Sequence, residues 1–183
     1  MQIIETKIKG LCVIEPDVFE DERGYFFESY SKKKLDGHLS EKYEFIQYNE
    51  SKSTYGVIRG LHYQLAPYSQ TKLIRVVHGK IYDVVVDLRK ESATFGEWYG
   101  IELSGEDKNQ FLIPKGLAHG FAVLSDTAII AYSCDEYYNP QSERGIIFND
   151  PALGIDWKIG HNEMILSEKD KKLPVFAEAD MNF

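Results

Sequence analysis

Residues 72–88 contain two β-rich runs, Lys72-Leu-Ile-Arg-Val-Val-His78 and Lys80-Ile-Tyr-Asp-Val-Val-Val-Asp-Leu88, separated by Gly79 alone. Branched and aromatic side chains dominate both runs, as is typical of strands. Similar short runs surround them at residues 44–47, 56–64, 98–103, 110–113, 118–124 and 127–134. Because no helical period intervenes, this spacing predicts a mainly β, antiparallel sandwich or barrel rather than a parallel α/β sheet.

The flanking segments add shorter elements. Strands are expected at 11–15 and 25–30, and Ser31 can cap a helix through 32–35 that ends at Gly37. Residues 140–150 look like a loop with a bend, and residues from about 177 carry no pattern and are expected to be loose. With 43% hydrophobic residues, residues 1–183 should form a single domain around one core.

Composition argues against several classes of protein. A net charge of −8 disfavours nucleic-acid binding, which needs a broad basic face. The N-terminus lacks the apolar core of a signal peptide, and no apolar run approaches the roughly 18 residues that span a bilayer, so we expect a cytoplasmic protein without membrane contact. Cys12 and Cys134 lie far apart and suggest reduced thiols rather than a disulfide framework or a zinc finger.

The stretch Arg59-Gly-Leu-His-Tyr-Gln64 offers a guanidinium that can bind an anion and an imidazole that can accept a proton near neutral pH. In a regular strand Arg59 and His62 would point to opposite faces. Both can line one pocket only if the backbone is distorted between them, so we expect a bulge or kink at Gly60-Leu61. Taken alone, the motif is also compatible with a surface arginine beside a packed core histidine.

The run Pro114-Lys-Gly-Leu-Ala-His-Gly120 makes a tight turn that leads His119 into a strand. Jelly-roll barrels of the cupin type carry such a turn, and there the histidine is often a metal ligand. The neighbouring His-x-His pair of metal cupins is replaced here by His62-Tyr63-Gln64, so a three-imidazole site cannot be assembled. Without a dinucleotide or P-loop motif either, a metal-free cupin with no cofactor is the better interpretation.

Two positions in the central runs are candidates for the barrel interior. Lys72 shares a face with Ile74 and Val76, so its ammonium either enters the barrel or reaches solvent at an edge. Asp83 and Asp87 share a face of the valine-rich run. An inward carboxylate there could orient His119 or His62, whereas Asp87 is expected on the solvated face.

Tyr132 and Asp170 each have a structural and a chemical interpretation. Tyr132 shares a face with Ile130 and Cys134, where it is either a packed core residue or an acid placed opposite a histidine. Asp170 follows Ser167 by three residues, which is the spacing of a helix start, so it could serve only as a capping residue.

Taken together, the sequence resembles the dTDP-4-dehydrorhamnose 3,5-epimerase family of the cupin superfamily from about Leu11 to Asp170. The matching blocks are Asp21-Glu-Arg-Gly-Tyr-Phe-Phe-Glu-Ser29, Arg59-Gly-Leu-His-Tyr-Gln64, Lys72-Leu-Ile-Arg-Val76, Ile113-Pro-Lys-Gly-Leu-Ala-His-Gly-Phe121, Tyr137-Tyr-Asn-Pro-Gln-Ser-Glu-Arg144, Asn149-Asp-Pro151 and Leu166-Ser-Glu-Lys-Asp170. The resemblance implies a jelly-roll homodimer with exchanged N-terminal strands. It also implies cofactor-free epimerisation of carbons 3 and 5 of dTDP-4-dehydro-6-deoxy-D-glucose in deoxysugar and surface-polysaccharide biosynthesis.

The same resemblance implies roles for individual residues. His62, paired with Asp170, would be the base, Tyr132 the acid on the opposite face, and Lys72 the cation that stabilises the enolate oxygen. The positions that match substrate contacts, some of them from the partner subunit, are Arg23, Phe26, Glu28, Gln47, Asn49, Arg59, His119, Tyr138, Glu143 and Lys169.

Several positions depart from the family pattern. Tyr48 stands where aspartate is common and Glu50 where histidine is frequent, both beside nucleotide-contact positions, which leaves the base and the sugar open. Phe148 and Lys158 replace a usual tryptophan and proline. The alternatives are a mono-epimerase, a ketoisomerase, a silent nucleotide-sugar-binding cupin and a metal-dependent cupin. Gln64 argues against the ketoisomerase, whose relatives tend to have a second histidine there.

Overall fold

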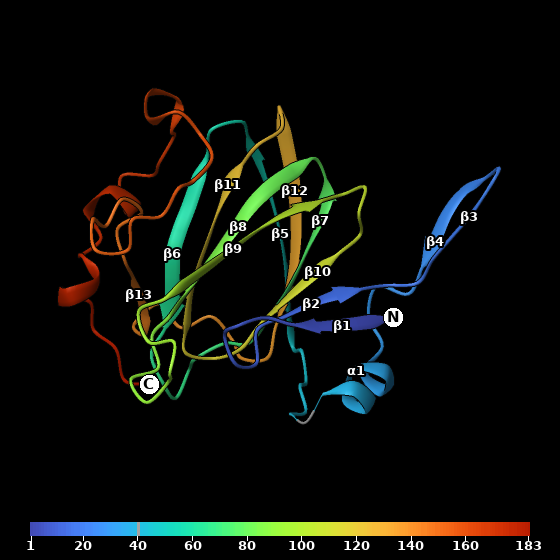
Figure 1. Ribbon diagram of the computed structural model, residues 1–183, viewed down its shortest axis with the longest axis horizontal. Helices are drawn as coiled ribbons and strands as arrows, with labels where there is room; N and C mark the ends of the chain where they lie inside the picture. The colour runs from blue at the N-terminus through green and yellow to red at the C-terminus, as the bar shows by residue number, and fades with distance from the viewer. Residues whose placement is uncertain (40) are drawn as a thin grey trace.

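The computed structural model describes residues 1–39 and 41–183, which build two facing antiparallel sheets and a projecting hairpin (Figure 1). The six-stranded sheet has the order β1 (Gln2–Glu5), β2 (Cys12–Glu15), β10 (Gln110–Ile113), β7 (Lys72–His78), β12 (Thr127–Cys134) and β5 (Gln47–Thr54). The five-stranded sheet has the order β13 (Glu143–Gly145), β6 (Ile58–Gln64), β11 (Leu117–Val123), β8 (Lys80–Asp87) and β9 (Trp98–Ser104). The hairpin consists of β3 (Val18–Asp21) and β4 (Gly24–Phe27).

From β5 to β13 the chain passes back and forth between the two sheets, except between the neighbours β8 and β9. All strand pairs within the described sheets are antiparallel, so the predicted mainly β, jelly-roll architecture is confirmed. Apolar residues on both faces of a strand contribute to two layers, because successive side chains of a strand point to opposite faces. On β8, for example, Ile81 and Val85 pack between the sheets while Val84 and Val86 pack on the outer face.

The helices are short: α1 (Lys32–His38) and the 3₁₀ turns η1 (His161–Glu163), η2 (Asp170–Lys172) and η3 (Phe176–Glu178). Among the described residues, none of these helices has the length and apolar character needed to cross a membrane. Ser31 caps α1 as predicted, since its hydroxyl accepts from Lys34 N. The predicted end at Gly37 is wrong. Buried Leu35 anchors the helix on the six-stranded sheet, and one glycine costs only about 1 kcal/mol in a helix.

Two predictions about neighbouring segments are also wrong. The run at 44–47 is not a strand of its own, because β5 starts at Gln47 and the buried rings of Tyr43 and Phe45 pack against Leu35 of α1. Residues 140–150 are not all loop, because β13 pairs with β6 there.

The C-terminal segment packs instead of being loose. Figure 1 shows it along the outer side of β6 and β13. Tyr63 donates a hydrogen bond to Asp180 O at 2.6 Å, and Asn182 pairs with both backbone groups of Ala66. Met181 and Phe183 add apolar contacts to the outer core. The pattern was missed because the apolar residues are few and irregularly spaced.

Asp87 is fully buried, which corrects the expected solvated position. Its carboxylate accepts from the guanidinium of Arg89 at 2.8 Å and from the hydroxyls of Ser92 and Thr94 at 2.7 Å each. Burial alone would raise the pKa of Asp87, but these hydrogen bonds outweigh it and lower the pKa to about 2. A carboxylate that is fully paired in this way can replace an apolar side chain at the end of β8.

Candidate active site

The pairing of β6 with β11 contains the irregularity predicted between Arg59 and His62. Arg59 pairs with Phe121 and His62 with His119, so two residues of β6 face a single residue of β11. Gly60 has φ +118°, and a Cβ there would lie 2.6 Å from the backbone of β11. Phe121 and His119 share the inward face, and the bulge therefore turns both Arg59 and His62 into the space between the sheets.

A cavity of about 500 Å³ lies between the two sheets and collects the residues expected to do chemistry. The five-stranded sheet contributes Arg59 and His62 from β6, and the six-stranded sheet contributes Lys72 from β7 and Tyr132 from β12. The other lining residues are Ser51, Val57, Ile58, Ile74, His119, Phe121, Ile130, Ile165, Leu166, Ser167, Lys169 and Asp170. His62 and Tyr132 thus belong to opposite walls of one cavity.

His62 is held by Asp170, whose side chain is almost completely buried. Nε2 of His62 lies 2.7 Å from Oδ1 of Asp170, and Asp170 N donates to the hydroxyl of Ser167 at 3.0 Å, as the capping signature predicted. Burial would raise the pKa of Asp170, but the hydrogen bond and charge of His62, with Ser167 and the Gly60 amide, outweigh burial and lower it. Ser167 therefore caps this turn, and the Asp170 side chain is the partner of the imidazole, whose Nδ1 is left to face a ligand.

His119, which lines the same cavity, forms a second imidazole–carboxylate pair with Asp83. Nε2 of His119 is 2.9 and 3.0 Å from the two carboxylate oxygens of Asp83, and both side chains are buried. Of the two histidines that Asp83 could orient, the structure selects His119. The ring of His119 is thus fixed in orientation next to the bulge that carries His62.

Lys72 and Tyr132 lie on adjacent strands of the wall opposite His62. Lys72 pairs in register with Cys134, and burial lowers the pKa of its ammonium, while Cys134, Asp83 and Glu143 oppose this shift. Burial also raises the pKa of the Tyr132 phenol, so this group keeps its proton. The cavity therefore presents a cation of lowered pKa and a protonated phenol, which are suited to stabilise an oxyanion and to donate a proton.

An adjoining pocket of about 270 Å³ shares His62, Lys72 and Tyr132 with this cavity and extends to Gln47, Asn49, Tyr138 and Glu143. Its outer wall is a chain of hydrogen bonds. Tyr138 N donates to Gln47 Oε1 at 2.9 Å, and the Tyr138 hydroxyl donates to Glu143, which also binds the ammonium of Lys169. Burial opposes the ionisation of Glu143, but these donors outweigh it and lower its pKa.

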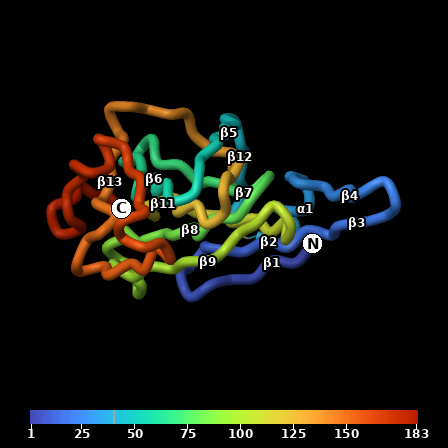
Figure 2. Tube along the Cα trace, turned by 90° about the horizontal axis from the view of Figure 1, so that it is seen from above, coloured from blue at the N-terminus to red at the C-terminus, as the bar shows by residue number. Residues whose placement is uncertain are grey.

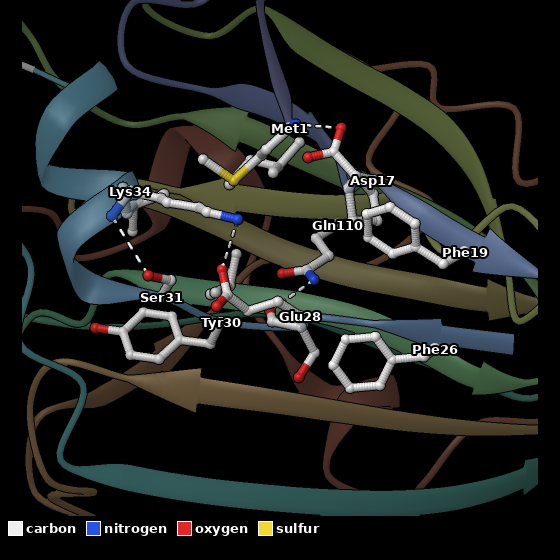
Figure 3. A pocket seen from close by; sticks show the side chains of 14 residues that line it. Met1, Asp17, Phe19, Phe26, Glu28, Tyr30, Ser31, Lys34 and Gln110 are labelled. Carbon is white, nitrogen blue, oxygen red and sulfur yellow. Dashed lines mark hydrogen bonds and ion pairs between the residues drawn. The ribbon is translucent and has the colours of Figure 1, made fainter.

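Three of the expected substrate-binding residues lie elsewhere in the chain. Arg23 and Phe26 belong to the β3–β4 hairpin, which extends away from both sheets (Figures 1 and 2). The strand expected at 25–30 ends at Phe27, so Glu28 lies outside it and forms an ion pair with Lys34 at 2.9 Å. Figure 3 shows Phe26 and Glu28 in a separate pocket near the N-terminal residue Met1. Within one chain, neither cavity described above is lined by these residues.

The side chains of Tyr48 and Glu50, which differ from the family pattern, point away from the pocket. Along β5 the residues at 47, 49, 51 and 53 are partly or fully buried, and those between them are exposed. Gln47 and Asn49 line the pocket, so Tyr48 and Glu50 face outward. These two departures therefore do not alter the pocket wall itself.

Ser53 of β5 is a site residue that sequence reasoning missed. Its hydroxyl accepts from Arg59 Nε at 3.1 Å and ties the guanidinium to the opposite sheet. The alternation of β5 would have placed Ser51 and Ser53 beside Asn49 if the strand had been recognised. In the described part of the chain, no three histidine, cysteine or acidic residues group as metal ligands.

Comparison with known proteins agrees with this geometry. The family model described as dTDP-4-dehydrorhamnose 3,5-epimerase matches residues 5–178. The dTDP-4-dehydrorhamnose 3,5-epimerase of Shigella flexneri is 48% identical over 180 residues, which are 98% of this chain and 98% of that protein. The crystal structure of the enzyme of that name from Elizabethkingia anophelis has a TM-score of 0.94 and 52% identity, with 97% of both chains covered.

A further solved structure is dTDP-6-deoxy-D-glucose-3,5-epimerase from Legionella pneumophila in complex with dTDP-4-keto-L-rhamnose. It has a TM-score of 0.93 and 48% identity, and the match covers 98% of this chain and 94% of that one. The family likeness inferred from the sequence is thus confirmed over almost the whole chain. The chain belongs to the dTDP-4-dehydrorhamnose 3,5-epimerase family of cupin-type isomerases.

Proposed function

We propose that the enzyme converts dTDP-4-dehydro-6-deoxy-D-glucose to dTDP-4-dehydro-L-rhamnose by inverting carbons 3 and 5. The observation that carries this proposal is the shared cavity, in which His62, bound to Asp170, and the Tyr132 phenol come from opposite sheets. Inversion next to a carbonyl requires a base on one face of the sugar and an acid on the other. It leaves the oxidation state of the substrate unchanged.

The proton transfers can be assigned to single groups. Asp170 accepts from Nε2 of His62, so Nδ1 is the atom that takes the proton from carbon 3 or carbon 5. The electron pair of the broken C–H bond moves into the 4-keto group, and the ammonium of Lys72 stabilises the resulting enolate oxygen. Tyr132 then donates its proton to the opposite face of the carbon. Before the next inversion the phenolate takes a proton from solvent and the imidazolium of His62 releases its proton to solvent.

The adjoining pocket suits the nucleotide half of the substrate. Arg59 lines the larger cavity and offers a fixed fork for the diphosphate, which explains how a chain with a net charge of −8 can hold an anion. Gln47, Asn49 and Tyr138 provide amide groups and an aromatic ring for the base. Lys169 lines the larger cavity and Glu143 the adjoining pocket, and their ion pair completes a polar wall.

We further propose a homodimer in which the N-terminal strands are exchanged and the hairpin of one subunit reaches the pocket of the other. Phe19, Tyr25 and Phe26 on the hairpin expose 65%, 56% and 69% of their surface, which is unusual for three aromatic side chains so close together. Such an arrangement would deliver Arg23, Phe26 and Glu28 to a substrate that they cannot reach in their own chain. The two buried free thiols are consistent with a cytoplasmic role in deoxysugar synthesis for surface polysaccharides.

The test of the reaction is NMR of the product formed from dTDP-4-dehydro-6-deoxy-D-glucose. Coupling constants of the sugar ring should show inversion at carbons 3 and 5. A product inverted only at carbon 3 would place the enzyme with mono-epimerases, one of which, from Streptomyces bikiniensis, is 31% identical with a TM-score of 0.89. Unchanged substrate would contradict the proposed function.

A further inference from the structure

Gln64 is the last residue of β6, and its side-chain amide is buried and hydrogen-bonded through both of its ends. Nε2 donates to the carbonyl oxygen of Tyr68 at 2.6 Å and to that of Tyr137 at 3.2 Å. Oε1 accepts from Asn139 N at 2.7 Å. Because Tyr137 and Asn139 flank Tyr138, one side chain holds the backbone on both sides of this tyrosine.

Tyr138 is fixed at two more points while its ring stays accessible. Its backbone N–H donates to Gln47 and its hydroxyl donates to Glu143 at 2.8 Å, yet the residue is 54% exposed. The ring lines the pocket that also contains His62 and Lys72. An immobilised ring with an open face is a suitable platform on which a nucleobase can stack.

The segment before Tyr137 has its own attachments. Gln70 donates to Glu136 O at 2.8 Å, and Asp135 accepts from Thr71 N at 2.6 Å and forms an ion pair with Lys115. Loss of the Gln64 amide would therefore loosen residues 137–139, where Tyr138 would keep only its bonds to Gln47 and Glu143, and would leave the preceding residues in place. The effect should be local to the nucleotide side of the pocket.

We propose that Gln64 is a positioning residue for the nucleotide half of the substrate, because it fixes the short segment that carries Tyr138. This inference rests on the proposed function, since it assumes a nucleoside diphosphate in the pocket beside Tyr138. Gln64 acts through Tyr138 and has no part in the proton transfers. Its contribution is preorganisation, which lowers the entropic cost of binding and leaves the chemical step unchanged.

The test compares Gln64→Met with the wild-type enzyme, because methionine keeps the length of the side chain and removes all three hydrogen bonds. Calorimetry with thymidine 5′-diphosphate should show a dissociation constant raised about tenfold, the size expected when a stacking contact is weakened. The KM for the nucleotide sugar should rise in parallel, while kcat stays within about twofold of wild type. Gln141→Met is the matched control, because this exposed residue forms hydrogen bonds through its backbone N and O alone within residues 1–39 and 41–183, and the variant should bind as wild type does.

A double-mutant cycle shows whether Gln64 acts through Tyr138. In a Tyr138→Ala background, Gln64→Met should weaken diphosphate binding by less than about twofold. An equal loss in both backgrounds would overturn the inference, as would a fall in kcat with unchanged KM. If Gln64→Met does not fold, Gln64→Glu gives the same readouts, because it keeps the acceptor for Asn139 and loses both donors. Wild-type enzyme that fails to bind the diphosphate contradicts the proposed function, whereas normal binding by the Gln64 variants contradicts only this inference.

Discussion

The phenol of Tyr132 lies on β12, across the cavity from His62 on β6. Tyr132→Phe keeps the ring and removes only the proton donor, so His62 can still remove the substrate proton and return one to the same face. We expect formation of the inverted sugar to fall by about 10²–10⁴-fold while exchange of the carbon-bound protons with solvent continues. NMR in D₂O measures both rates in one sample.

Tyr55→Phe is the control for this experiment, because its hydroxyl contacts Glu163 on the surface and Tyr55 lines neither cavity. The Tyr55→Phe enzyme should invert the sugar and exchange its carbon-bound protons at the wild-type rates. If exchange and inversion are lost equally in Tyr132→Phe, Tyr132 is not the acid of the return step.

The sequence predicted the bulge at Gly60 correctly and the position of Asp87 wrongly, and the difference has a physical reason. The bulge was predictable because Arg59 and His62 can share a pocket only through a distortion, and Gly60 is the residue that tolerates it. The state of Asp87 was not predictable from alternation, because its burial depends on Arg89, whose guanidinium neutralises it from the loop after β8.

At the scale of elements, the loop after β8 is held by the buried Asp87 carboxylate. Its pKa of about 2 lies below the unfolded value of about 3.9, so the stabilisation is fully present above about pH 4 and is lost as pH falls through about 2. This group should account for about 2 kcal/mol of the acid-linked loss in free energy of unfolding. Asp87→Asn should remove that part of the pH dependence, as measured by urea unfolding between pH 6 and pH 2.

The matched control is Glu168→Gln, because Glu168 is exposed and, among the residues that the structure describes, forms an ion pair with the nearby Lys171 alone. It should retain the acid sensitivity of the wild-type enzyme. An Asp87→Asn curve parallel to that of wild type would show that Asp87 does not link stability to pH.

Long strands rich in apolar residues were placed correctly from sequence, whereas short or irregular ones were not. Strands β7, β8 and β12 have seven or eight residues, at least half of them branched or aromatic, so local preference and tertiary packing agree. Strands β1, β3 and β13 have only three or four residues, too few to show a clear pattern. β1 and β3 form hairpins with the neighbouring strands β2 and β4, whereas β13 pairs with the distant strand β6. The inward face of β5 is polar, so it carried no hydrophobic signal although it contributes the pocket residues Gln47 and Asn49.

At the scale of the whole molecule, the projecting hairpin makes the proposed dimer testable by complementation. An Arg23→Ala chain and a His62→Asn chain should each be nearly inactive alone. In a mixed dimer, the hairpin of the His62→Asn chain completes the site of the Arg23→Ala chain, so one of the two sites works. Random reassembly of equal amounts should therefore restore about a quarter of wild-type activity.

If the hairpin contributes to the site of its own chain, mixing should restore no activity. The activity of the mixture would then equal the mean of the activities of the two variants. Sedimentation of the mixture serves as the control that dimers have formed. The partner contribution was inferred from family resemblance alone, since no pattern within one chain indicates which copy a projecting hairpin contacts.

The most direct test of the acid–base account is deuterium incorporation into dTDP-4-dehydro-6-deoxy-D-glucose in D₂O, followed by NMR. Wild-type enzyme should place label at carbons 3 and 5, and His62→Asn should place it at neither. Label at a single carbon, or labelling that persists unchanged without the imidazole of His62, would contradict the account.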